Sequence, residues 1–210
     1  MKKWMLTCVC ALAFTGSVLA ETLPLPPPVK EGGMPLMQAL NERHVSRQFN
    51  PVKKMDMQTL SNLLWAAFGE NRPDGRRTAP TARNAQDTLI YVALPEGVFL
   101  YNAQENTLEE ISKEDIRAKT GKQSEMLASA PVVLIYVSDY NKLDFAEGEK
   151  KLFYSALHTG SIYQNVDLFA ASEGLNTVML GMVNYEELPQ LLKLSDHQKV
   201  LIVQPVGYKP

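Results

Sequence analysis

Two arginines and a histidine lie within five consecutive positions of this chain, in the segment Arg43-His44-Val45-Ser46-Arg47-Gln48-Phe49. The segment follows a short stretch, residues 34–40, whose apolar residues have helical spacing. The three polar groups can therefore leave the end of a helix together and converge on one anion. Arginine suits a phosphate because its planar guanidinium makes two charge-assisted hydrogen bonds at once. The alternative is a solvated set of cations that merely complements the helix dipole.

A second polar segment, Pro80-Thr81-Ala82-Arg83-Asn84-Ala85-Gln86, comes just before a β-branched and aromatic run. That run, residues 88–94, predicts a buried strand. The polar segment would then be a loop that enters the sheet, where it can reach a ligand. Taken alone, a loop with Thr, Asn and Gln is also ordinary turn chemistry.

A third segment, residues 174–183, follows a long amphipathic stretch at about 152–172. Gly174 can end that helix in the left-handed conformation. Gly181 would let the backbone approach a flat ring closely, because a Cβ atom would block such an approach. A strand with one small residue is the alternative.

In this order and spacing the segments resemble the motifs of the nitroreductase family, which binds flavin mononucleotide (FMN). Residues 43–49 resemble R-[RH]-S-x-[RK]-x-F, and residues 80–86 resemble P-S-x-x-N-x-Q. Residues 174–182 resemble G-L-x-[ST]-x-x-[IL]-G-[GM], and residues 200–208 resemble the closing strand with its P-x-G-Y ending. The spacer at 63–80 is most similar to the branch that contains the azoline dehydrogenases of thiazole/oxazole peptide synthesis.

The resemblance implies a role for each matched residue. Arg43 and Arg47 would anchor the flavin phosphate, and the amides of Gly181 and Met182 would face the flavin N5. The loop at 80–86 would reach the flavin of the other subunit in a dimer. No side chain is implied as a catalytic acid or base. The implied cofactor-binding residues are Arg43, His44, Val45, Arg47, Thr81, Arg83, Asn84, Gly181, Met182 and Lys209.

Two of these positions depart from the family pattern. Val45 stands where the family usually has serine, and this removes a hydroxyl donor worth about 1 kcal/mol. The family's basic C-terminal segment is reduced here to Lys209. FMN would then bind more weakly, or Ser46 would compensate.

The elements that must position these residues alternate between strands and helices. This order predicts an α+β fold, a three-layer sandwich with a mixed central sheet covered by helices, and the resemblance adds an intertwined homodimer. The expected helices are at 35–41, 56–68 (with Asp56 as N-cap), 113–126, 152–172 and 185–192. The expected strands are at 88–94, 97–101, 107–111, 131–137, 177–180 and 200–208.

The N-terminal residues predict export. Residues 1–20 have two lysines, an apolar run too short to span a bilayer and a small-residue ending, which together are typical of a signal peptide. Residues 21–33 are a proline-rich arm, either a tether or a segment that packs across a partner subunit, and residues 34–210 form the FMN-binding domain. Both cysteines lie within residues 1–20, so the mature chain has none for disulfides or thiol catalysis. The expected location is the bacterial periplasm.

Charge and histidine spacing exclude other functions. The chain has 21 basic and 23 acidic residues, and loss of Lys2 and Lys3 would lower its net charge from −2 to −4. A nucleic-acid partner is therefore not expected. The three histidines have no carboxylate at ligand spacing, so no metal site is expected, and His158 is expected to be a packed or interface residue.

The sequence thus indicates an exported FMN-dependent oxidoreductase that transfers hydride to or from a small molecule, such as a nitroaromatic or a quinone. NAD(P)H is one candidate reductant, although nicotinamide cofactors are cytoplasmic. The alternative is a non-catalytic flavin-binding or scaffold protein that keeps the fold.

Overall fold

A computed structural model describes residues 21–210 of the chain. The expected signal peptide at residues 1–20 lies outside the described residues. Within residues 21–210, no helix combines the length and the hydropathy needed to cross a membrane.

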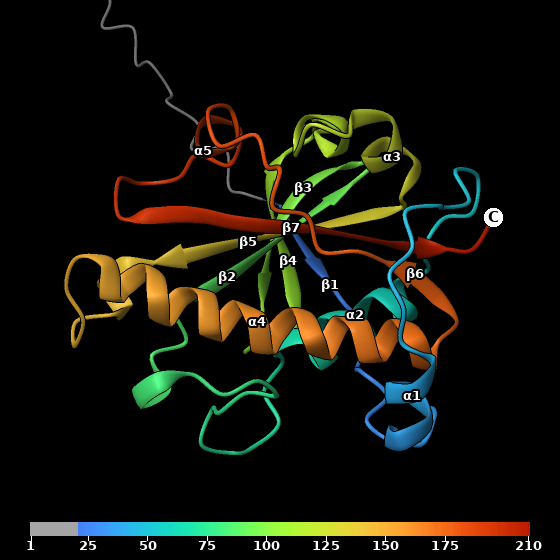
Figure 1. Cartoon of the computed structure of the whole chain (residues 1–210), viewed down its shortest axis with the longest axis horizontal. Helices are drawn as coiled ribbons and strands as arrows, with labels where there is room; N and C mark the ends of the chain where they lie inside the picture. Colours follow the sequence, from blue (N-terminus) through green and yellow to red (C-terminus); the bar gives the residue numbers. More distant parts are fainter. Residues whose placement is uncertain (1–20) are drawn as a thin grey trace, which may run out of the picture.

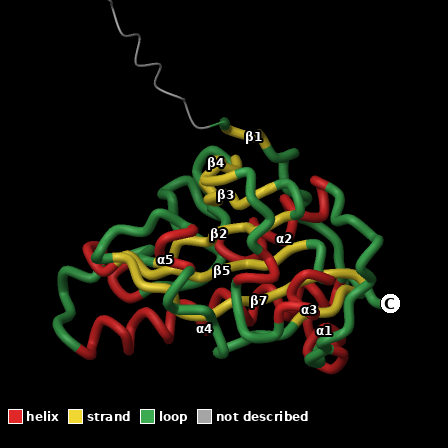
Figure 2. Tube along the Cα trace, turned by 90° about the horizontal axis from the view of Figure 1, so that it is seen from above, coloured by secondary structure: helices red, strands yellow, loops and turns green. Residues whose placement is uncertain are grey.

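A sheet of seven strands forms the middle of the molecule, in the order β1-β4-β3-β2-β5-β7-β6. Figure 2 shows these strands in succession, from β1 at one end to β7 near the other. Every recorded strand pairing within the described chain is antiparallel, whereas the sequence pattern predicted a mixed sheet. Short hairpins join β2, β3 and β4, and the longer connection after β5 returns the chain so that β7 runs opposite to it. The strands are β1 (Thr22–Pro24), β2 (Thr88–Leu94), β3 (Gly97–Asn102), β4 (Thr107–Ser112), β5 (Val132–Asp139), β6 (Leu175–Thr177) and β7 (Gln198–Tyr208).

Helices cover both faces of the sheet, and this confirms the expected α+β sandwich. Figure 1 shows α1, α2 and the long α4 on one side and α3 and α5 on the other. The helices are α1 (Leu36–Glu42), α2 (Met57–Phe68), α3 (Ser124–Ser129), α4 (Glu149–Ser172) and α5 (Leu188–Leu191), with single 3-10 turns at Ala82–Asn84, Arg117–Lys119 and Tyr140–Lys142.

The central strand β5 explains why both faces need a cover. Leu134 and Tyr136 pack into the cluster under α2 and α4, while Val133 and Ile135 pack into the cluster on the opposite face. All four side chains are fully buried. Successive side chains of a strand point to opposite faces of the sheet. Because both faces are covered here, the strand is apolar at consecutive positions.

Local signals fix the ends of the two main helices. The Asp56 carboxylate accepts a hydrogen bond from the Thr59 amide at 2.9 Å, as expected of the N-cap of α2. Gly174 has φ +66°, so it ends α4 in the left-handed conformation that the sequence predicted.

Three predicted elements differ from the structure. The helix expected at 113–126 is wrong: only the turn at Arg117–Lys119 and α3 form there. Asp115 and Thr120 bond to the backbone of Arg117, and Gly121 packs so closely on the Met182 carbonyl that a Cβ atom would lie 2.8 Å from it. These local contacts replace helical ones.

The other two differences are shifts of boundary. The strand expected at 177–180 forms earlier, as β6, and only a single bridge joins Leu180 to Val203. The helix expected at 185–192 is shortened to α5.

The proline-rich arm packs on its own chain. Its β1 pairs with β4, and Leu25 is buried in the core beneath α2. The Pro26 carbonyl accepts a hydrogen bond from the Ser61 hydroxyl at 2.5 Å, and the Val29 amide donates to Asn62 at 2.8 Å. Residues 21–33 thus close one edge of the sheet.

Candidate functional site

The first group of predicted site residues gathers beside the C-terminal half of α4. Arg43 lies directly after α1, and its Nη1 is 3.4 Å from Oδ2 of Asp167 on α4. His44 and Lys209 line one small cavity of about 30 Å³ together with Asp167. The chain then runs along β6, where the Ser46 amide donates to the Thr177 carbonyl at 3.1 Å. His44 and Lys209 are 165 residues apart in the sequence, and the fold brings these basic side chains to the same cavity.

The remaining residues of this segment make no contact with the Asp167 group in the described chain. Val45 and Arg47 are exposed. The Ser46 hydroxyl is 3.4 Å from the Gln48 amide, from which it accepts a hydrogen bond. Ser46 therefore serves a local turn in this chain.

A buried polar network holds Arg43 in place. Asp167 accepts from the Gln204 amide at 2.9 Å, and Gln204 accepts from the Tyr136 hydroxyl at 2.5 Å. Burial raises the pKa of Asp167, and this effect is opposed by Arg43 and by the hydrogen bond from Gln204. The network ties the candidate phosphate ligand to the centre of the sheet.

The second group, Thr81, Arg83 and Asn84, lies in a strained loop before β2. Arg83, Asn84 and Gln86 all have φ near +50°, which is uncommon for residues with a side chain. Gln86 holds the loop closed, because its amide donates to Thr81 Oγ1 at 3.0 Å and its side chain bonds to Arg77 and to the Gly75 carbonyl.

A buried histidine anchors the same loop. His158 on α4 accepts a hydrogen bond from the Ala82 amide through Nε2, at 2.8 Å, so its other nitrogen, Nδ1, carries the proton. Nδ1 donates to Asp87 Oδ1 at 2.5 Å, and the Ser138 hydroxyl donates to Asp87 Oδ2 at 2.7 Å. Burial alone would raise the pKa of Asp87, but these two hydrogen bonds lower it below its ordinary value. His158 is packed as expected, and the structure adds its role as an anchor.

The third group, Gly181 and Met182, lies on the connection after β6. The Met182 carbonyl accepts from the Lys122 amide at 3.0 Å, and the flanking Leu180 pairs with Val203. Both Gly181 and Met182 are exposed, and a Cβ atom built on Gly181 would meet nothing within 4 Å. Hydrogen bonds of Leu180 and Met182 thus fix the backbone around Gly181, while Gly181 itself faces open space.

One chain does not bring all three groups into one cavity. The loop is anchored at His158 and Arg43 at Asp167, nine residues apart on α4, which corresponds to about 13.5 Å of helix. Thr81, Arg83 and Asn84 line a separate cavity of about 490 Å³ together with Arg72, Arg76 and Arg77. The Arg43 group and the loop at 80–86 are therefore two separate candidate half-sites in the described chain.

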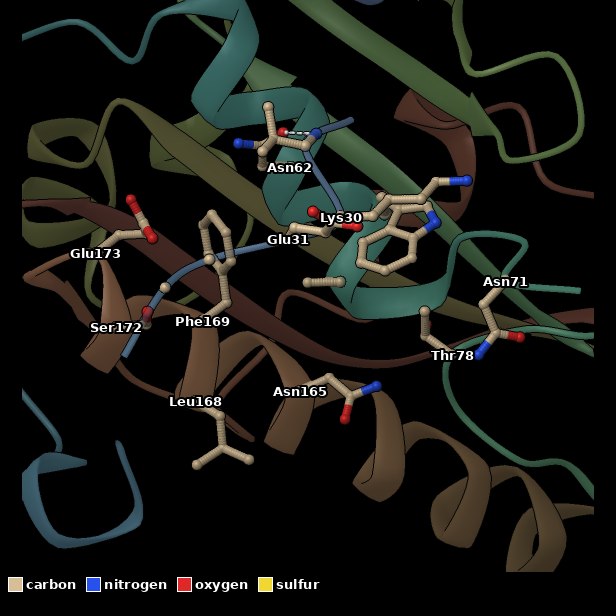
Figure 3. A pocket seen from close by; sticks show the side chains of 15 residues that line it. Lys30, Glu31, Asn62, Asn71, Thr78, Asn165, Leu168, Phe169, Ser172 and Glu173 are labelled. Atoms are coloured by element: carbon tan, nitrogen blue, oxygen red, sulfur yellow. Dashed lines mark hydrogen bonds between the residues drawn. The ribbon is translucent and has the colours of Figure 1, made fainter. Parts of the chain in front are cut away.

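A larger cavity of about 570 Å³, which sequence reasoning did not find, lies under the N-terminal arm. Figure 3 shows Asn62 on one side, Phe169 and Asn165 of α4 on the other, and the arm passing between them. The Lys30 ammonium lies 5.5 Å from the centre of the Trp65 ring, which is a further lining residue. None of the predicted flavin ligands lines this cavity.

Comparisons with known proteins agree on one family. A model described as "Nitroreductase family" matches residues 40–208. A protein of Methanocaldococcus jannaschii, named as a candidate nitroreductase, is 30% identical over 164 residues, which are 74% of this chain and 82% of its own length. The crystal structure of a candidate nitroreductase from Ralstonia eutropha JMP134 has a TM-score of 0.85 at 32% identity and covers 90% of both chains.

A more distant match concerns the fold alone. A chain of the E. coli microcin synthetase McbBCD complex, solved with truncated pro-MccB17 bound, has a TM-score of 0.69 at 19% identity. The match covers 98% of the present chain and 85% of the other.

Proposed function

Because the chain belongs to the nitroreductase family of oxidoreductases, we propose that it is an exported, homodimeric, FMN-dependent enzyme. It acts on a small organic molecule such as a nitroaromatic or a quinone. FMN, when bound, supplies hydride transfer at its N5 atom. The observation that carries the proposal is the meeting of Arg43, His44 and Lys209 around Asp167 of α4. The open backbone at Gly181 supports it.

The residues present fit a flavin nucleotide. Arg43 and Lys209 supply cationic donors for a phosphate, and the carboxylate of Asp167 orients the Arg43 guanidinium. The lack of a side chain at Gly181 leaves room for a flat ring beside the backbone. A ring at that position would lie against the amides of Gly181 and Met182, which can donate to its N5.

The dimer is proposed because it joins the two half-sites. The exposed face of α4 presents two large apolar side chains to solvent, Phe153 (59% exposed) and Leu157 (52% exposed). If two copies pack through this face, Thr81, Arg83 and Asn84 of one copy would approach the Arg43 group of the other. The strained loop anchored on His158 would then close the second side of the flavin.

Reductant and location belong to the same proposal. The signal-like residues 1–20 support export to the periplasm. NAD(P)H is a candidate reductant, but nicotinamide cofactors are cytoplasmic. A quinol, a redox partner or a substrate that itself donates hydride are therefore the other candidates.

The test is an absorbance spectrum of the purified protein, with FMN titrated in if it is colourless. We expect about one FMN per subunit. Replacing Arg43 with alanine should weaken binding by roughly 10- to 150-fold, because it removes a charge-assisted contact worth about 1.5–3 kcal/mol. Lys199→Ala, which removes an exposed cation elsewhere on the surface, is the matched control. No flavin band and no thermal shift with excess FMN would refute the proposal.

Sedimentation tests the dimer separately. Phe153→Glu should give monomers that also lose FMN affinity, whereas Lys150→Glu, at an exposed position on the same helix, should leave a dimer. A wild-type protein that is monomeric and still binds FMN fully would refute the shared site.

A non-catalytic flavin-binding protein is the second candidate. The exposed Val45, where the family has serine, favours it. Yellow protein whose flavin is reduced by dithionite, but by neither NAD(P)H nor quinols, would support this candidate over the enzyme.

A further inference from the structure

Four arginines line one cavity beside the loop at 80–86. This arginine pocket, of about 490 Å³, has no acidic residue in its lining. Its volume lies in the range of cavities that hold small organic ligands. The lining residues are Arg72, Arg76, Arg77, Ala79, Pro80, Thr81, Arg83 and Asn84.

Three of the four guanidiniums have no carboxylate partner among the ion pairs of residues 21–210. Arg77 donates to the Phe68 carbonyl at 3.1 Å and to Gln86 at 2.8 Å, and Arg72 donates to the Arg77 carbonyl at 3.2 Å. The Arg83 guanidinium lies 4.9 Å from the centre of the Phe145 ring. Only Arg76 has an acidic partner, the exposed Asp74 at 3.4 Å. Neutral oxygens and a ring thus orient Arg72, Arg77 and Arg83, none of which has a carboxylate within ion-pair distance in the described chain.

Burial makes this charge costly. Arg77 is half-buried, and burial lowers its pKa, although Glu70 opposes the effect. Guanidiniums that line one cavity also repel one another. A bound anion would relieve that repulsion and accept the paired donors of the guanidinium forks. The concentration of arginines also contrasts with the net charge of −2 for the whole chain.

The pocket shares a wall with the proposed flavin site. Thr81, Arg83 and Asn84 belong both to its lining and to the loop assigned to the flavin of the second copy. An anion in the pocket would therefore lie next to the bound flavin. Resting on the proposed function, we propose that the arginine pocket is the subsite for a carboxylate or phosphate group of the substrate, so that the enzyme selects acidic organic molecules.

Binding of a matched pair of probes tests the pocket without turnover. Calorimetric titrations of the flavin-free and the FMN-saturated protein would compare 4-nitrobenzoate with 4-nitrobenzyl alcohol, which differ in charge at similar size. We expect the acid to bind at least ten times more tightly than the alcohol. Its binding should weaken as salt is added. Equal affinity for the two probes would overturn the proposal.

The double variant Arg72→Gln/Arg76→Gln identifies the place of binding, since both side chains are exposed and their loss should not disturb the core. We expect affinity for 4-nitrobenzoate to fall at least tenfold. Lys54→Gln/Lys199→Gln removes the same charge at exposed positions elsewhere and should keep full affinity. Unchanged binding of the acid in the arginine variant would overturn the assignment.

A titration with FMN shows whether the anion in the arginine pocket belongs to the substrate or is the flavin phosphate. If the pocket holds the substrate, the arginine double variant should keep FMN affinity within about twofold, whereas Arg43→Ala loses it. A loss of FMN affinity as large as that of Arg43→Ala would show that the pocket holds the flavin phosphate, and would overturn the substrate assignment. The probes are also titrated into flavin-free protein, so the test of the arginine pocket does not depend on FMN. Failure of FMN to bind would therefore refute the proposed function alone.

Discussion

Replacing Asp87 should destabilise the protein strongly, because this carboxylate is fully buried and accepts two side-chain hydrogen bonds. A hydrogen bond to a charged group is worth about 1.5–3 kcal/mol, so the two contacts together represent about 3–6 kcal/mol. Asp87→Ala leaves the Ser138 hydroxyl and the His158 Nδ1–H without their partner. We expect a loss of about 3–5 kcal/mol in the free energy of unfolding, as for other buried polar pairs from which one member is removed.

The pH dependence of a second variant, Asp87→Asn, isolates the charge. The pKa of Asp87 is lowered from 3.8 in the folded protein, so the folded state binds this proton less tightly than the unfolded state. The stabilisation is therefore present above about pH 3.8 and is lost as the pH falls through the folded pKa. The difference in unfolding free energy between wild type and Asp87→Asn should be about 1–3 kcal/mol near pH 7 and should shrink in acid.

Urea unfolding at a series of pH values measures this difference. Asp196→Asn, at an exposed position, is the matched control and should change the free energy of unfolding by less than about 0.5 kcal/mol. Amide hydrogen exchange adds a local readout, since Ala82 should lose protection when the His158 anchor is loosened. A cost for Asp87→Asn that is the same at every pH, or a cost for Asp87→Ala below about 1 kcal/mol, would refute the reasoning.

The other predictions concern helix capping, a tight turn and the proposed cofactor site. Asp56→Ala should lower the free energy of unfolding by about 1 kcal/mol in urea titrations, because it removes the N-cap of α2. Gly97→Ala should cost more than about 2 kcal/mol by the same assay, since φ is +147° and a Cβ atom would lie 2.4 Å from the Ser112 carbonyl oxygen. Gly181→Val should leave the melting temperature unchanged, because space is open there, but should abolish FMN binding in absorbance titrations. Val45→Ser should tighten FMN binding by about 1 kcal/mol, roughly fivefold, and an unchanged Kd would show that this position does not reach the phosphate.

The fold was largely predictable because its main elements carry local signals. The strand at 88–94 is observed with the bounds that its β-branched run predicts, and the helix expected from Asp56 begins one residue later because Asp56 is its cap. The helix expected at 113–126 fails because Gly121 must pack on Met182, a contact between residues about sixty positions apart. No local pattern carries such information. The same holds for the strand pairings, which depend on how distant segments meet.

The sequence names candidate site residues but does not predict how they are arranged. The motif residues could be named because their spacing resembles a family. The residues that orient them are His158 and Asp167 on α4, Asp87 before β2 and Gln204 on β7, and no motif spacing links them. One signal was present in the sequence: Gln204 interrupts an apolar run, and Asp87 directly precedes one. A polar residue that a strand must bury needs partners, which predicts a network without naming its members.

The position of β7 in the sheet constrains the order in which the protein can fold. β7 is the last strand along the described chain, yet it lies between β5 and β6, and β6 has its strand pairing with β7. Hairpins of β2, β3 and β4 can form as soon as they are synthesised, but one side of the sheet stays unfinished until residues 198–208 have left the ribosome. Until then one edge of the apolar strand β5 stays unpaired, and β6 has no strand partner. This delay would give a translocation machinery time to engage the chain before it folds, which suits the proposed export.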